Sequence, residues 1–60
     1  MNKITVQLDD QQAAALAQAC KRARRFSVLE LAESGQEADL IVDALSVLRV
    51  ALRDAGFAPR

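Results

Sequence analysis

The side chains best suited to binding a ligand form a basic cluster, four cations within five residues: Lys21, Arg22, Arg24 and Arg25. One interpretation is structural, because cations near the C-terminus of a helix are stabilised by its dipole and can donate to its last carbonyls. The other is functional, because the same side chains can contact phosphates or the acidic surface of a partner. Four charges are more than a helix end requires, so the basic cluster is a candidate contact surface.

Residues suited to catalysis or metal binding are scarce. The chain has no histidine, which excludes Ser-His-Asp and Cys-His catalysis and most zinc sites. Cys20 is the single cysteine and lies on an apolar helix face, where a small buried hydrophobic residue is favoured over a reactive thiol. The carboxylates between residues 30 and 43 fall at helix starts and on a polar face, which favours solvation over Mg²⁺ binding. We therefore expect no catalytic residue, no cofactor and no metal, and a protein that acts by binding.

Length and composition indicate one domain, residues 1–60, near the size at which burial barely offsets the entropy cost of folding. Hydrophobic residues make up 52% of the chain, yet Phe26 and Phe57 are its only aromatics, which predicts an aliphatic, alanine-rich core. Eight basic and eight acidic residues exclude a chain-wide basic field for nucleic acid. Neither an apolar run of about 20 residues nor a signal-peptide pattern is present, so we expect a cytoplasmic protein without membrane contact.

Residues 3–8 alternate strictly between apolar and polar side chains. This period of two, with β-branched residues dominating, predicts a short β-strand with Ile4 and Val6 on one face. A lone strand is unstable, and no other stretch predicts a strand as well. We therefore expect this strand to pair with its copy in a second subunit.

Three capping boxes predict three helix starts after that strand. They are Asp9 with Gln12, Ser27 with Glu30, and Ser34 with Glu37. The first helix is expected to run to about Ala23 and the second, a short one, to begin at Val28. The third is expected within residues 34–57, with Gly56 as its stop and Pro59 preventing continuation.

The long third helix is apolar over about half its circumference, wider than the ~100° stripe of an ordinary surface helix. One apolar stripe contains Ile41, Leu45, Leu48 and Leu52, and a second one beside it contains Leu40, Ala44, Val47 and Ala51. A chain of this length has too little else to cover both. The sequence therefore predicts a mostly α protein with one N-terminal β-strand, in the order β-α-α-α, that forms a homodimer through the strand, the long helix or both. The expected interface residues are Ile4, Val6, Ile41, Leu45, Leu48 and Leu52.

The N-terminal stretch ITVQLDD resembles the opening of ribbon-helix-helix repressors, whose paired strands enter the major groove of DNA. That resemblance implies a dimeric, DNA-binding transcriptional repressor. Lys3, Thr5 and Gln7 would then face outward to read bases, and the arginines of the basic cluster would contact phosphates. The alternative for these three residues is a solvated strand face.

A second resemblance covers nearly the whole chain and is most specific at its ending, residues 55–60, AGFAPR. It resembles short proteins carried by prophages and other mobile elements of proteobacteria, a family with no assigned activity. This implies an accessory role, either as a small repressor or as a stoichiometric inhibitor of host defence in the manner of anti-CRISPR proteins. Our leading hypothesis is a non-enzymatic accessory protein that binds a host protein through the basic cluster. The DNA-binding repressor is the alternative.

Overall fold

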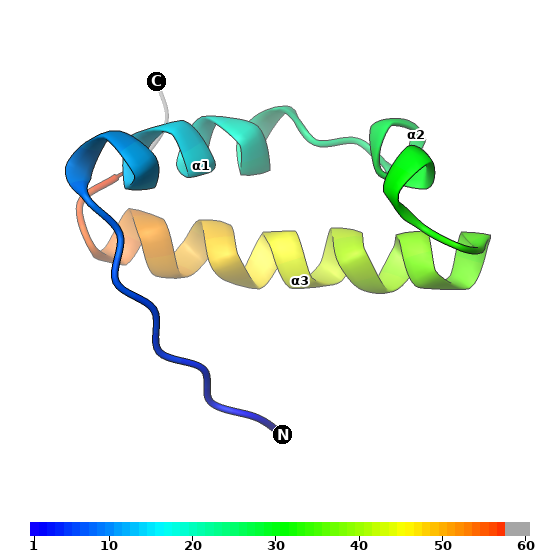
Figure 1. The fold of residues 1–60 in the computed structure, drawn as a ribbon, viewed down its shortest axis with the longest axis horizontal. Coiled ribbons are helices and arrows are strands. Elements are labelled where there is room, and N and C mark those ends of the chain that lie inside the picture. Colours follow the sequence, from blue (N-terminus) through cyan, green and yellow to red (C-terminus); the bar gives the residue numbers. More distant parts are fainter. Residues whose placement is uncertain (58–60) are drawn as a thin grey trace.

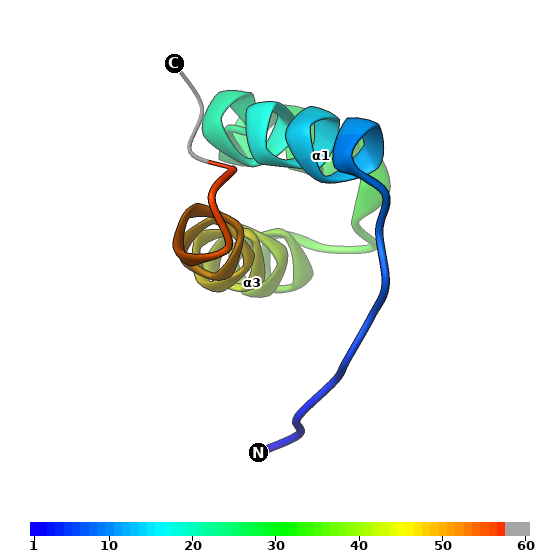
Figure 2. The same ribbon diagram turned by 90° about the vertical axis from the view of Figure 1, so that its left-hand side faces the viewer.

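The computed structural model describes residues 1–57, which form an extended N-terminal arm followed by two layers of helices (Figure 1). The order is α1 (Asp10–Arg22), α2 (Arg25–Val28), the 3-10 helix η1 (Leu29–Leu31) and α3 (Gly35–Asp54). Helix α1 lies antiparallel against the C-terminal half of α3, and α2 packs near the start of α3 (Figures 1 and 2). Within this range, no helix is both long enough and apolar enough to cross a bilayer.

The predicted N-terminal strand is wrong. Residues 1–9 carry no regular secondary structure, and the described part of the chain is a small all-helical domain without a strand. The arm leaves the start of α1 and extends past α3 (Figure 2). The alternation of apolar and polar residues indicates which side chains would share one face of a strand. A strand also needs a neighbouring strand for its backbone hydrogen bonds. The other described residues of this chain form helices and turns, so no such neighbour is present among them.

Helix α1 begins at the predicted capping box. The Gln12 backbone N–H donates to the Asp9 carboxylate at 2.7 Å, and the Asp9 backbone N–H donates to the Gln12 side-chain oxygen at 3.1 Å. Two N–H groups that a helix start leaves unsatisfied thus gain acceptors. The helix ends at Arg22, one residue before the predicted Ala23.

Helix α2 does not begin where the second capping box predicted. It starts at Arg25 and ends at Val28, so Ser27 lies inside the helix instead of capping it. The break in the chain comes earlier, because Ala23 and Arg24 are both extended, with ψ values of 129° and 156°. A serine can cap a helix only if its own backbone is non-helical. Ser27 does not meet this condition, because α2 already begins at Arg25.

Helix α3 has the predicted ends. The Glu37 backbone N–H donates to the Ser34 hydroxyl at 3.1 Å. At the other end Gly56 adopts a φ of 98°, and the N–H groups of Phe57 and Gly56 donate to the carbonyls of Leu52 and Arg53 at 2.9 and 3.0 Å. This is a Schellman motif, which satisfies the last carbonyls and folds Phe57 back onto the helix. Pro59 lies outside the described residues.

The core between α1 and α3 is thin. It contains Ala13, Ala17 and Cys20 from α1 and Leu52 from α3, with Leu16, Leu45, Leu48 and Phe57 packed around them. Alanine lets the two helix backbones approach closely but contributes little apolar area. Cys20 is a buried free thiol, as expected for a small hydrophobic residue. Val28 of α2 and Ala38 of α3 are also buried, and these two helices contact each other.

Candidate functional site

The four cations of the basic cluster do not all lie at one site, because the chain turns between them. Lys21 and Arg22 end α1, Arg24 lies in the extended link, and Arg25 begins α2. Lys21 and Arg24 line a cavity between α1 and α3, whereas Arg22 is exposed and does not line it. The structure thus divides the predicted contact surface into residues with different roles.

Arg25 is engaged within the chain. Its Nε donates to the Asp39 carboxylate at 2.6 Å, and its Nη2 donates to the Gly35 carbonyl at 3.4 Å. Both side chains of the ion pair are more than half exposed, which limits its contribution to about 0–1 kcal/mol. The geometry nevertheless ties the start of α2 to the first turn of α3, so Arg25 has a structural role here.

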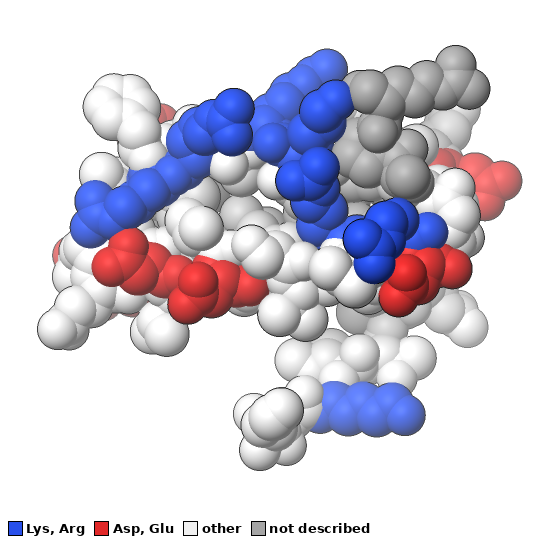
Figure 3. Space-filling view, turned by 180° about the vertical axis from the view of Figure 1, so that it is seen from behind, with Lys and Arg blue, Asp and Glu red and all other residues white. Residues whose placement is uncertain are grey.

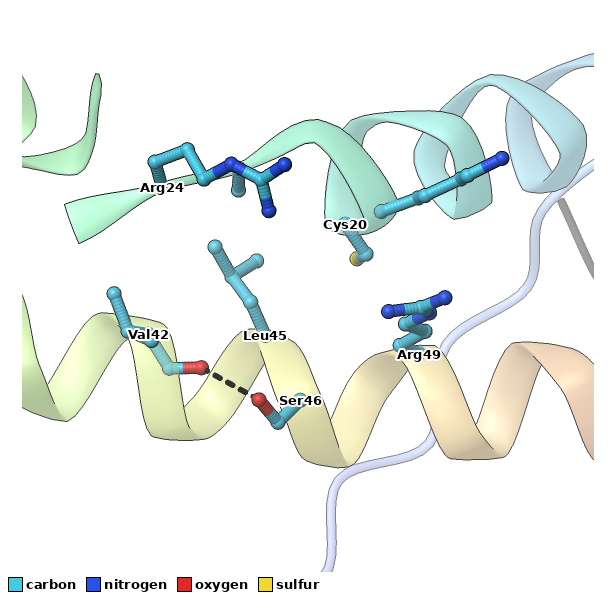
Figure 4. A pocket seen from close by; sticks show the side chains of 8 residues that line it. Cys20, Arg24, Val42, Leu45, Ser46 and Arg49 are labelled. Atoms are coloured by element: carbon cyan, nitrogen blue, oxygen red, sulfur yellow. Dashed lines mark hydrogen bonds between the residues drawn. The ribbon is translucent and has the colours of Figure 1, made fainter. Parts of the chain in front are cut away.

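A third cation, Arg49, joins Lys21 and Arg24 at the cavity (Figure 4). The cavity has a volume of about 120 Å³, and Cys20 and Leu45 lie between its cations (Figure 4). We call this site the basic pocket and define it by Lys21, Arg24 and Arg49. Ser46 also lines it, but its hydroxyl already donates to the Val42 carbonyl at 3.1 Å. Two helices and the link between α1 and α2 therefore each contribute one positive charge.

The electrostatics of the basic pocket favour an anionic ligand. None of the residues that line it is acidic. Among residues 1–57, neither Arg24 nor Arg49 has a hydrogen-bond or ion-pair partner. On the face that Figure 3 shows, basic side chains gather in a band, with carboxylates close beside it. Like charges brought together repel one another, and an incoming carboxylate or phosphate would relieve that repulsion.

Arg49 was not among the predicted contact residues. The sequence places it on the polar arc of the long helix, where it resembles any solvated arginine. Only the packing of α1 onto α3 brings it to Arg24, twenty-five positions away in the chain. One sequence feature hinted at its role. The polar arc carries two cations, Arg49 and Arg53, whereas the charged residues at the start of the same helix are acidic.

The predicted base-reading residues lie elsewhere. Lys3, Thr5 and Gln7 are exposed on the arm, whose free end lies on the other side of α3 from the link between α1 and α2 (Figure 1). The structure does not bring them to the basic pocket. Their predicted role in DNA readout required paired strands, and residues 1–57 contain no strand.

The residues predicted for a dimer interface fall into two groups. Leu52 is buried, Ile41, Leu45 and Leu48 are half-buried, and the last two pack against the core, so the first apolar stripe is covered within the chain. Ile4 and Val6 are exposed on the arm, and Val6 borders an apolar cavity of about 220 Å³. The second apolar stripe is the one left open, because Leu40 and Val47 are exposed. Dimerisation itself stays a prediction.

The fold and the site define a small helical protein with a thin core, an open apolar stripe and a basic pocket. Groups of histidine, cysteine and carboxylate side chains able to hold a metal ion do not occur among the described residues. Over residues 1–60 the chain matches a family of unknown function, DUF7706, and it belongs to that family. No curated protein and no solved structure matches it.

Proposed function

We propose that this protein works by binding another protein in a fixed ratio, with the basic pocket at the contact. The observation that carries this proposal is the convergence of Lys21, Arg24 and Arg49 on one cavity that has no acidic lining residue. Guanidinium groups bind carboxylates through two parallel hydrogen bonds, so an acidic side chain of a partner suits Arg24 and Arg49. The protein would act without catalysis, because its chemistry consists of positioned charge.

An acidic protein surface fits the charge distribution better than a nucleic acid does. The band of cations has carboxylates directly beside it (Figure 3), and the net charge of the chain is zero. A DNA backbone is a continuous row of phosphates and would meet these carboxylates along with the cations. A protein surface carries charges of both signs and can match both.

The biological setting is a further part of the proposal. The resemblance of residues 55–60 to prophage-borne proteins supports an accessory protein of a phage or mobile element. A stoichiometric inhibitor of host defence fits a chain that has positioned charge and apolar surface and contains no histidine for acid–base catalysis.

DNA binding is the second candidate, and the uncompensated charges of Arg24 and Arg49 favour it. Contacts of this kind would be phosphate contacts, which give affinity without sequence readout. Retention on duplex DNA would then fall steeply as salt increases.

Quantitative affinity purification from a proteobacterial extract tests the proposal, with and without nuclease. The pocket variant is Arg24→Glu with Arg49→Glu, and the matched control is Arg22→Glu with Arg53→Glu, which changes the charge equally outside the pocket lining. We expect one protein to be retained in constant ratio by the wild type and the control, to be lost by the pocket variant, and to be unaffected by nuclease. Equal retention by the pocket variant, or release by nuclease, would contradict the proposal.

A further inference from the structure

The outer face of α3 carries an apolar stripe that nothing in the described chain covers. We call it the outer seam and define it by Leu40, Ala44, Val47 and Ala51. Leu40 and Val47 expose 69% and 72% of their surface, and both alanines are exposed as well. The four residues are spaced by four, three and four positions, the repeat by which two helices pack side by side. The outer seam therefore has the pattern of a helix–helix contact without its partner.

The accessible surface of the chain is large for its mass. It measures 5192 Å², whereas a compact protein of 6.5 kDa exposes about 3,800 Å². The surplus of about 1,400 Å² includes the arm, residues 1–9, which are all exposed, together with the exposed side chains of the outer seam. The core is also small, since Leu52 and Val28 are its largest buried side chains within residues 1–57.

The order of residue sizes along the outer seam identifies the partner. Large and small side chains alternate: Leu40, Ala44, Val47, Ala51. If a second α3 runs antiparallel, with a twofold axis passing between positions 45 and 46, Leu40 faces Ala51 of the partner subunit. Ala44 then faces Val47 of the partner subunit, so each large side chain meets a small one. A parallel pairing would instead place large against large and leave gaps between the alanines, which close packing disfavours.

We propose that α3 pairs antiparallel with α3 of a second copy of this chain through the outer seam. A twofold axis makes such a contact self-complementary and closes the assembly at two subunits. Ala51 also lines the apolar cavity that Val6 and Leu8 border, so the partner packs next to the arm and extends a surface that is already apolar.

The pairing leaves the basic pocket open. Val42, Ser46 and Arg49 line that pocket from α3, and they lie about half a turn around the helix from the outer seam. A dimer therefore carries two accessible basic pockets. For this reason the inference stands independently of the proposed function, and either one can fail while the other holds.

Sedimentation equilibrium of the full chain tests the pairing. We expect a mass of twice 6.5 kDa at micromolar concentration. Val47→Glu buries a charge in the outer seam and should raise the dimer dissociation constant on the order of 100-fold or more. Ser46→Glu, one position away on another face, should leave it nearly unchanged. A single-chain mass for the wild type at hundreds of micromolar would overturn the inference. So would a dimer that survives Val47→Glu.

A swap of side chains tests the register and does not depend on a charged variant folding. Ala44→Val alone makes valine face valine, and Val47→Ala alone makes alanine face alanine, so each should weaken the dimer. The double variant Ala44→Val with Val47→Ala restores one large and one small side chain at each contact. We expect its dissociation constant to return to within about threefold of the wild type. A double variant no tighter than the weaker single variant would refute the antiparallel register.

Discussion

Leu52 should contribute more to stability than any other side chain of α3. It is 7% exposed and packs against Ala13, Ala17 and Cys20, which are too small to fill the space it would leave. Leu52→Ala removes the transfer free energy of the lost carbons and leaves a cavity, for a cost of about 2–5 kcal/mol. A chain of 60 residues has a total stability of roughly 3–9 kcal/mol at the usual value per residue. The substitution therefore removes a substantial fraction of the stability, and where the cost is highest and the stability lowest it unfolds the protein.

Urea denaturation followed by far-ultraviolet circular dichroism measures this cost. The midpoint for Leu52→Ala should fall sharply while the dependence on urea stays the same, since the surface exposed on unfolding hardly changes. Leu31→Ala is the matched control, because it makes the same chemical change at a side chain that is 78% exposed. We expect the control to shift stability by less than about 0.5 kcal/mol. Equal losses for the two variants would refute the reasoning, because burial would then not determine the cost.

Three further predictions concern local features. Gly56→Ala should lower the free energy of unfolding, measured by urea denaturation, by about 1 kcal/mol. The cause is backbone conformation alone, because φ is 98° and an added Cβ would meet no atom within 4 Å. An unchanged free energy of unfolding would refute this. Asp9→Ala should cost about 0.5–2 kcal/mol by removing the cap of α1, whereas Asp10→Ala, beside it but with no part in the capping box, should cost less; equal costs would exclude the cap. The buried Cys20 thiol should react with iodoacetamide many times more slowly in buffer than in 6 M guanidinium, as mass spectrometry can follow; equal rates would show that the thiol is accessible.

The ends of α1 and α3 were predictable because the groups that determine them are close in sequence. Asp9 and Gln12 satisfy each other across three positions, and Gly56 supplies the left-handed conformation that the end of α3 needs. Ser27 shows the limit of this approach. The same spacing of Ser and Glu recurs there, but the extended link before Arg25 begins the helix earlier, so the motif has no helix start to cap.

The lack of a strand in residues 1–9 and the side of α3 that α1 covers were not predictable, because both depend on residues far away in the sequence. Alternation at residues 3–8 carries no information about a neighbouring strand. For α3, the sequence showed two apolar stripes but not which of them α1 would cover. The structure places the alanine face of α1 against Leu45, Leu48 and Leu52, which leaves the outer seam exposed. The basic pocket was not predictable for the same reason, because Arg49 and Arg24 line one cavity only after α1 packs against α3.

The central claim is that one chain does not bury its own apolar surface and that a second copy completes it. The most direct measurement is the thermal unfolding midpoint of the wild-type protein at two concentrations a hundredfold apart. Because mass action stabilises a dimer by about 2.7 kcal/mol over that range, the midpoint should rise by several degrees with concentration. A midpoint that is the same at both concentrations would show that the single chain is stable by itself and would contradict the claim.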